Sequence, residues 1–389
     1  METEPWRRYT GWWWKRSKEG GNLTVKLALV ELKRIFKRKM SLITIIITPV
    51  LVVLISLFFM QGYNLQSMKL GIYNEDNSIW SSLVMRFIGT ILRQENIVKV
   101  GEDYEDLLKE GKLNAVIIIP KGFAAELYAK RPTRMVFIPS PVDLHLAAAI
   151  YNVLDSVLED FQGSAFFDPK VLRYIFTSSD YPVPRLALKD SSLRFSDLVS
   201  PFIIFFTGIL ITVSLACVST FLDREKNLHE MFLVYNLSWW EYALGKIVAY
   251  TILGVSVSLA AYVLTRLLTE SSMSFVLVFL LVVLNSLLHT SVGFIVSAVS
   301  SDKSLANILG VSVIGISLFS SGFAIPISNL PEYLKRIAMA TPVFKTMYTL
   351  RLYQLERAVD IHSIFYVGVW TAVFLALSIF SGRLVIRRG

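Results

Sequence analysis

LDREKNLHEMFLVYNLSWWEYALGK, residues 222–246, is a short charged and aromatic stretch between two long uncharged runs. The run before it covers residues 198–221 and the run after it covers residues 247–265. Each is long enough to cross about 30 Å of hydrocarbon as a helix rising 1.5 Å per residue. The stretch is therefore expected to lie in water between two membrane helices.

The composition of the whole chain agrees with a membrane protein. Hydrophobic residues make up 54% of the 389 residues, which is more than a soluble domain can bury. The formal charge of +9 is concentrated beside apolar runs, so anionic lipid and membrane topology explain it better than nucleic acid. The single cysteine, Cys217, excludes an intramolecular disulfide and indicates packing.

Residues 1–40 form a basic segment with eleven Lys or Arg and four Glu. By the positive-inside rule, this end is expected in the cytoplasm. Within it, residues 24–39 carry Val25, Leu29, Leu32 and Phe36 at helical spacing between basic residues. This pattern predicts an amphipathic helix that lies on the inner membrane surface and contacts membrane lipids.

Six apolar runs have spanning length, and the fold class that follows is a polytopic helical membrane protein. The predicted spans are residues 41–60, 198–221, 247–265, 275–299, 305–325 and 363–384. An even number of spans returns the tail, residues 385–389, to the cytoplasm, and its two arginines agree with that side. The expected location is the plasma membrane, with both termini cytoplasmic.

Residues 61–197 have a different character, with 15 Lys or Arg and 17 Asp or Glu. Short β-branched runs alternate with helical patterns, which predicts an extracytoplasmic α/β domain inserted between the first two spans. Strands are expected near residues 69–73, 97–100, 115–119 and 135–138, and helices near 78–93, 103–110, from 123 onward, and at 144–161. Residues 169–197 are expected to be irregular.

Motifs for enzyme chemistry are absent from the sequence. There is no HExxH, no GxSxG and no paired-cysteine motif, and the histidines have no metal-ligand or catalytic spacing. The pairs Gly111-Lys112 and Gly245-Lys246 lack the other residues of a phosphate-binding loop. We therefore expect no catalytic residue, no metal and no cofactor on this chain.

Several polar residues lie inside the predicted spans. Asn285 and His289 are four residues apart and share one helix face, and Thr207, Ser214 and Asn307 lie in other spans. Two interpretations stay open for them: hydrogen bonding and close packing between helices, or the lining of a translocation path.

The opening stretch itself predicts a short amphipathic helix. Acidic residues in its first turn suit a helix dipole, and Leu228, Met231, Phe232 and Tyr235 make one apolar face. By physical chemistry alone, this face could contact either lipid or a protein groove.

The stretch resembles the cytoplasmic coupling segment of ABC-2 type transporter permeases. Asp223, Arg224, Glu225, Glu230 and Gly245-Lys246 match that pattern, whereas Asn227-Leu228 and Tyr235-Asn236 stand where Gly-Thr and Thr-Pro are usual. Further matches follow the family's order: LGIYNEDNS at 70–78, GKLNAVIIIPKGFAAEL at 111–127, and residues 321–351 with Gly322, Pro326, Leu330-Pro331, Pro342 and Arg351. They are similar to the subgroup with a large extracytoplasmic domain, and imply re-entrant helices on the outer side within residues 326–362.

The resemblance implies a permease subunit of an ATP-driven exporter. It implies a second permease subunit, identical or different, and a separate ABC ATPase that binds ATP and magnesium and grips residues 222–242. The expected ATPase-contacting residues are Asp223, Arg224, Glu225, Glu230, Met231 and Phe232. The apolar spans favour a lipidic or amphipathic drug-like substrate. The resemblance to the family adds sodium as another candidate substrate.

Two other function classes are compatible with a polytopic membrane protein. An ion-gradient transporter often carries inverted repeats, and the two groups of three spans show no convincing similarity. In a membrane-anchored binding or sensing protein, the α/β domain would do the work and the spans would serve only as an anchor. Six spans that contain polar residues are more than an anchor needs.

Overall fold

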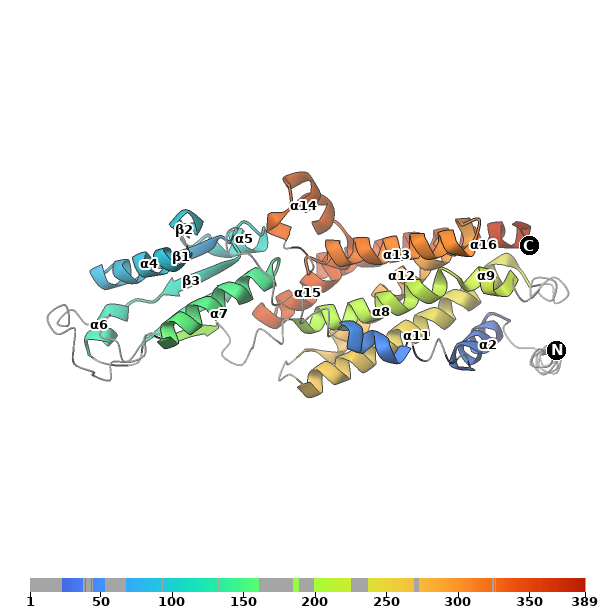
Figure 1. Ribbon diagram of the computed structural model, residues 1–389, viewed down its shortest axis with the longest axis horizontal. Helices are drawn as coiled ribbons and strands as arrows, with labels where there is room; N and C mark the ends of the chain where they lie inside the picture. Colours follow the sequence, from blue (N-terminus) through green and yellow to red (C-terminus); the bar gives the residue numbers. More distant parts are fainter. Residues whose placement is uncertain are drawn as a thin grey trace.

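The computed structural model describes residues 23–37, 39, 43, 45–52, 68–92, 94–129, 131, 133–160, 185–188, 199–224, 237–268, 273–323, 325 and 327–388. Within these ranges, an α/β domain and a bundle of long helices lie end to end, with two short helices, α14 (Glu332–Met339) and α15 (Pro342–Glu356), where they meet (Figure 1). α9 (Ser219–Arg224), which leads into residues 225–236, lies at the end of the bundle farthest from the α/β domain.

The α/β domain is built on a five-stranded sheet with the order β2-β1-β3-β4-β5. The strands are β1 (Leu70–Asn74), β2 (Ile97–Lys99), β3 (Ala115–Ile119), β4 (Arg134–Pro139) and β5 (Arg185–Leu188). β1 is parallel to β2 and β3, β4 is antiparallel to β3, and β5 is parallel to β4. The expectation that residues 169–197 are irregular is wrong at β5, a four-residue strand too short to show a period of two.

Helices cover both faces of this sheet. α4 (Ile79–Leu92) and α7 (Leu144–Asp160) share one apolar cluster with the strands, and α5 (Tyr104–Lys109) contributes to a second cluster with Val116. η2 (Gln94–Asn96) and α6 (Phe123–Tyr128) complete the domain. β3 reads AVIII because its side chains are covered on both faces of the sheet. The predicted strands and helices up to residue 160 agree with the structure within about two residues.

The bundle contains α8 (Ser200–Ala216), α9 (Ser219–Arg224), α11 (Trp239–Leu268), α12 (Phe275–Val299), α13 (Lys303–Ser320) and α16 (Ile361–Arg388). Among the described residues, α11, α12, α13 and α16 are long and apolar enough to cross a membrane, and α8 is a shorter apolar helix. The first predicted span is described only at residue 43 and residues 45–52, which are helical. Four spanning helices are thus found by length and composition in the described part of the chain, where the sequence predicts six.

The helix that contains the third predicted span, residues 247–265, begins before that span. Residues 239–246, predicted as part of the coupling loop or helix, form the first two turns of α11. One half of a capping box marks this start, in which the backbone N–H of Ser238 donates to Glu241 Oε2 at 3.0 Å and the Ser238 hydroxyl donates to the same oxygen. The sequence Ser-Trp-Trp-Glu carries this signal, which apolar run length alone does not detect.

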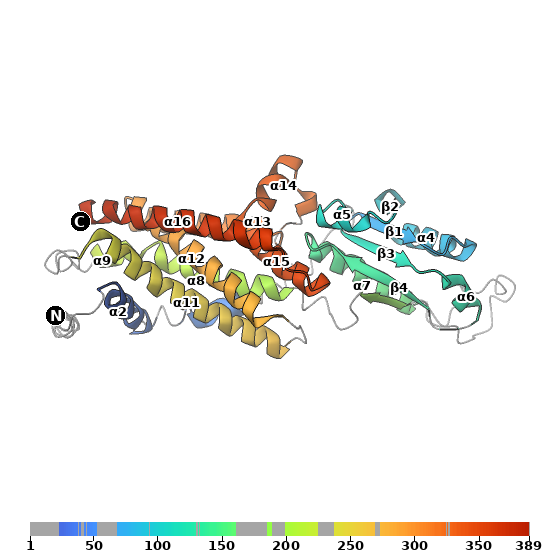
Figure 2. The ribbon, with the colours of Figure 1, turned by 180° about the vertical axis from the view of Figure 1, so that it is seen from behind.

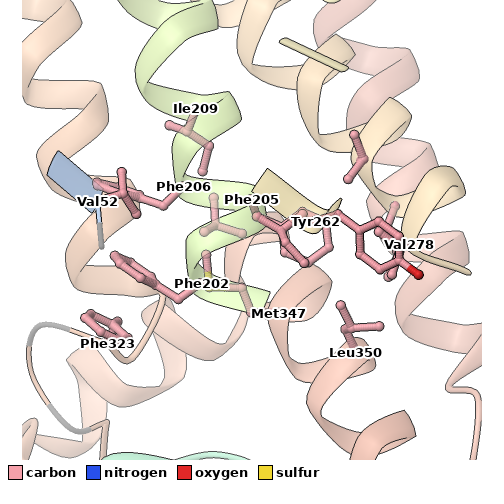
Figure 3. Packing of buried hydrophobic residues seen from close by; sticks show 14 of the residues in the cluster. Val52, Phe202, Phe205, Phe206, Ile209, Tyr262, Val278, Phe323, Met347 and Leu350 are labelled. Atoms are coloured by element: carbon pink, nitrogen blue, oxygen red, sulfur yellow. The ribbon is translucent and has the colours of Figure 1, made fainter. Parts of the chain in front are cut away.

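Small residues set the spacing of the helices in the bundle. A side chain on Gly254 of α11 would run into Thr212 of α8 and would lie 3.2 Å from Ser286 Oγ of α12. Apolar packing completes the contact: the Phe202 and Phe323 rings stack with centroids 3.6 Å apart, beside Met347 (Figure 3). Close approach at small residues is the usual basis of helix association in membranes.

After α13 the chain turns at Gly322, whose φ of 68° suits glycine, and continues into three short helices. These are η6 (Ile327–Asn329), α14 (Glu332–Met339) and α15 (Pro342–Glu356). Leu330 and Pro331 precede α14, and Pro342 opens α15 after the Thr341 cap. The three short helices η6, α14 and α15 occupy the region predicted to be re-entrant. Whether they enter the membrane stays a prediction. Pro326 lies outside the described residues.

A buried aspartate of the α/β domain forms hydrogen bonds with these short helices. Asp143 accepts hydrogen bonds from the backbone N–H groups of Ile327 at 2.5 Å and Ser328 at 3.0 Å. Asn114 Nδ2 donates to Ser328 Oγ at 3.2 Å, and Val142 packs in an apolar cluster with Ile327. Burial raises the pKa of the Asp143 carboxyl, although the hydrogen bonds that it accepts oppose this rise. The domain and the short helices are thus one packed unit.

The close contact at Gly254 generates a packing prediction. Gly254→Ala is expected to lower the free energy of unfolding by about 1–3 kcal/mol, because Thr212 and Ser286 leave no room for a methyl group. Gly315→Ala on α13, where nothing lies within 4 Å, should leave stability unchanged or raise it by up to about 1 kcal/mol. Unfolding midpoints of the purified variants in one detergent test this, and equal midpoints would contradict it.

The Asp143 junction generates a second prediction. Asp143→Ala leaves two backbone N–H groups without their acceptor and should cost about 2–4 kcal/mol. Amide exchange at Ile327 and Ser328 should become faster, whereas Asp106→Ala, at an exposed position of α5, should change neither quantity. Unchanged exchange at both amides in the Asp143 variant would show that the carboxylate does not hold the junction.

Candidate functional site

The structure describes the two ends of the opening stretch and not its middle. α9 ends at Arg224, and the described chain resumes at Leu237, just before α11. Glu225, Glu230, Met231 and Phe232, predicted to contact an ATPase, lie outside the described residues. The described part of this site therefore consists of the groups at the two ends of the loop.

Asp223, one residue before the end of α9, is fully buried. Its Oδ1 accepts from Arg34 Nη1 at 2.5 Å, and its Oδ2 lies 2.6 Å from Lys246 Nζ. The hydroxyl of Tyr242 donates to the same Oδ2 at 2.8 Å. Both carboxylate oxygens are thus occupied by groups from two other helices.

The remaining members of this cluster come from α2 (Leu23–Lys37), which packs against α11. Glu31 pairs with Arg34 at 2.7 Å and also with Lys246, whose ammonium donates to the Ser219 carbonyl at 3.3 Å. We call Glu31, Arg34, Asp223 and Lys246 the ion cluster. It joins α2, α9 and α11 with two negative and two positive charges.

The ion cluster is balanced in charge and largely removed from water, since none of its four residues is more than 9% exposed. Burial would raise the pKa of Asp223, but the charges of Lys246 and Arg34 and their hydrogen bonds hold it below its usual range. Burial would likewise lower the pKa of Arg34, but Glu31 and Asp223 raise it above the ordinary value. Both groups therefore stay charged at neutral pH.

The ion cluster bears on two predictions about this region. Asp223 was predicted to contact an ATPase; its carboxylate is enclosed by Arg34, Lys246 and Tyr242, and an ATPase contact of this residue stays a prediction. The amphipathic helix predicted over residues 24–39 is found as α2, with Glu31 and Arg34 on its buried face in place of most of the predicted apolar stripe, and its position on the inner membrane surface stays a prediction. Val25, Leu29 and Phe36 of that stripe are 53%, 47% and 53% exposed.

Sequence reasoning missed Glu31, Arg34, Tyr242 and Lys246 as a group. Glu31 and Arg34 were counted among surface charges, because charged residues in an amphipathic helix usually face water. A signal was nevertheless present: Glu31 and Arg34 lie on the helix face that also carries Leu27 and Ile35. Arg34 and its partner Asp223 are 189 residues apart in the chain, a pairing that local patterns cannot indicate.

The polar residues predicted inside the spans fall into two groups. Asn285 and His289 are brought together within the bundle: Asn285 Nδ2 donates to the Phe205 carbonyl at 3.3 Å, and His289 Nδ1 lies 2.8 Å from the Asn285 carbonyl oxygen. Thr207 is buried and bonds to Ile203 of its own helix. Ser214 is half-buried, and Asn307 is exposed on α13. A role for these residues in a translocation path stays a prediction.

Two further observations bear on chemistry. Among the described residues, no group of three or more His, Cys, Asp or Glu side chains could hold a metal ion. Arg351, matched above to the family pattern, is fully buried on α15. The ion cluster joins three helices through paired charges in the described part of the bundle.

The ion cluster generates a prediction about charge balance. Lys246→Met leaves two buried carboxylates with one cation and should lower the free energy of unfolding by about 3–5 kcal/mol. The double variant Glu31→Gln/Lys246→Met restores neutrality and should be more stable than the Lys246→Met single variant. Unfolding midpoints of the singles and the double complete the cycle. Losses that simply add would contradict a role for charge balance.

Comparison with known proteins places the chain in a family. The family described as "ABC-2 family transporter protein" matches residues 39–380, which is most of the chain. No curated protein matches it. The matched region includes the α/β domain, the long helices of the bundle and the loop ends. This chain therefore belongs to the ABC-2 transporter family and is a multi-pass membrane permease.

Proposed function

We propose that this permease is the transmembrane subunit of an exporter that uses ATP hydrolysed by a separate ABC ATPase. Residues 225–236 would dock on that ATPase, with Arg224, Glu225 and Glu230 as polar contacts and Met231 and Phe232 as the apolar face. ATP and magnesium would be bound by the ATPase, since this chain carries no phosphate-binding loop. The loop and both termini would then lie in the cytoplasm.

The observation that supports this proposal best is how the loop ends are held. Asp223 before the loop and Tyr242 and Lys246 after it are bonded to one another inside the protein. When the two ends of a loop are bonded to each other, a force applied to the loop moves the helices on both sides of it. When the ends are independent, the loop can change shape without moving those helices. Rigid supports are what a coupling segment requires.

The supports extend from α9 to the end of α12. The backbone N–H of Thr220 donates to Ser297 Oγ of α12 at 3.2 Å, and the Thr220 hydroxyl donates to the Ser297 carbonyl at 3.1 Å. α8 continues directly into α9, and α11 begins at the other end of the loop. Movement of the loop would therefore reach α8, α11 and α12 together.

The transport path belongs to the same proposal. A second permease subunit, identical or different, would face this one, with the path between the two. Asn307 on the exposed side of α13 and the half-buried Ser214 are its accessible candidates on this chain, whereas Thr207, Asn285 and His289 support the packing of the bundle. An amphipathic or lipidic substrate fits the apolar surface of α13, and sodium is the second candidate.

A charge reversal in the loop tests the coupling. Glu225→Arg should abolish co-purification with the ATPase subunit and lower ATP-dependent transport at least about tenfold, because it repels a cationic partner group. Glu126→Arg, an exposed reversal on α6 of the α/β domain, is the matched control and should change neither. Pull-down and transport assays with both subunits in proteoliposomes provide the measurement.

The outcomes separate the function classes. Intact co-purification and transport in the Glu225 variant would refute the docking assignment. Transport that persists without any ATPase and follows an ion gradient would indicate a secondary transporter. Ligand binding by the full chain with no transport under either condition would indicate a membrane-anchored binding protein.

A further inference from the structure

α8, α11 and α12 lie side by side in the bundle and meet at small and polar residues (Figure 2). A side chain on Gly208 of α8 would run into Ser258 Oγ of α11. One on Gly254 of α11 would lie 3.2 Å from Ser286 Oγ of α12. Four polar residues at this meeting point are at most 1% exposed, and we call them the polar junction: Ser258, Asn285, Ser286 and Thr290.

Each residue of the polar junction has an oxygen atom without a hydrogen-bond partner. Each of these oxygens exposes less than 1 Å², so water does not reach it either. The atoms are Oγ of Ser258, Oδ1 of Asn285, Oγ of Ser286 and Oγ1 of Thr290.

A neighbouring hydroxyl on the same helix behaves differently. Ser291 of α12 is equally buried, and its Oγ donates to the Leu287 carbonyl at 2.8 Å, one turn back. This bond to the preceding turn is the usual way in which a helix accommodates a buried hydroxyl. Because the polar junction lacks such bonds, the closed contact between its helices carries a cost that hydrogen bonds would remove.

The middle of α11 is held to its neighbours by packing alone. At the loop end, Lys246 Nζ donates to the Ser219 carbonyl at 3.3 Å, and toward the other end the Tyr262 hydroxyl donates to the Met273 carbonyl at 3.4 Å. Between these two links, α11 is fully described over residues 247–261, and no hydrogen bond joins these residues to α8 or α12. α11 is therefore bonded near its ends and unbonded at the polar junction.

We propose that the middle of α11 moves locally away from α8 and α12, between its two bonded ends, and that water molecules then bind the polar junction. Local opening of this kind leaves the ends of the helices in place, so it is separate from any movement of whole helices. It gives the bundle a hydrated state between α8, α11 and α12. The inference goes beyond ATP-driven transport and does not need an ATPase.

Water is the ligand that fits these groups. The three hydroxyls can donate and accept, the free Asn285 oxygen can only accept, and water supplies both kinds of hydrogen bond. A metal cation is a poorer ligand, because none of the four side chains is negatively charged and the charge would enter the bundle unbalanced.

Removal of single hydroxyls tests the cost of the closed junction. In the full chain in phosphatidylcholine nanodiscs, Ser258→Ala and Ser286→Ala should each raise the unfolding midpoint by about 2 °C or more, because each removes a buried oxygen that has no partner. The control Ser291→Ala removes a buried hydroxyl that has a partner, so its midpoint should fall or stay the same. Midpoints that do not rise in either junction variant would overturn the proposal.

A thiol probe tests the opening itself. In the full chain carrying Cys217→Ala, Ser258→Cys should react with a small water-soluble thiol reagent at least about tenfold faster than Ser291→Cys, since the polar junction opens without unfolding of the chain. Adding Ser286→Ala should slow the reaction at position 258, because it stabilises the closed junction, and should leave position 291 unchanged.

Equal reaction rates at positions 258 and 291 would refute local opening. A rate at position 258 that Ser286→Ala does not slow would show that the unpartnered oxygens do not drive it. Because no ATPase is present in these experiments, their results are independent of the test with Glu225→Arg.

Discussion

The arrangement of the bundle at its loop end depends on the ion cluster. Four charged side chains withdrawn from water are costly individually, and they are tolerated here because each contacts an opposite charge. Such a cluster contributes little net stability compared with apolar packing. It does specify geometry: Asp223 accepts from three groups at once only when α2, α9 and α11 are all in place. The cluster thus fixes which helices bracket the loop.

At the opposite end of the bundle, a buried carboxylate again joins separate elements, here with fewer charged partners. Asp143 of the α/β domain binds two adjacent backbone N–H groups at η6, and the apolar cluster around Val142 closes the contact. Between the two ends, contact depends on small residues such as Gly254 and on stacked phenylalanines. Hydrogen bonds and ion pairs thus hold the helices at the two ends, and close apolar packing holds them in between. Helices connected in this way are expected to move together as rigid bodies.

Much of the fold could be predicted from sequence, for reasons that are local. The run AVIII at 115–119 and the uncharged run at 275–299 identify a strand and a helix by composition and length. The helix start at Trp239 is not visible in the length of the apolar run, because the first turns of α11 are charged and aromatic; the Ser238–Glu241 hydrogen bond marks it instead. β5 was missed because four residues carry too little pattern.

The candidate site was less predictable, because it depends on pairing across the chain. The resemblance located the loop, but no local pattern shows that Asp223 turns inward or that its partner Arg34 comes from a helix near the start of the chain. The positions of Glu31 and Arg34 in the sequence do place them on the same side of the helix as Leu27, and not on the side of Val25. Assigning each charged residue to a side of the helix, rather than to the surface by its polarity, would have separated the residues that face the bundle from those that face away from it. One side of α2 thus carries the contacts that hold the loop supports, and the exposed apolar residues lie on another side.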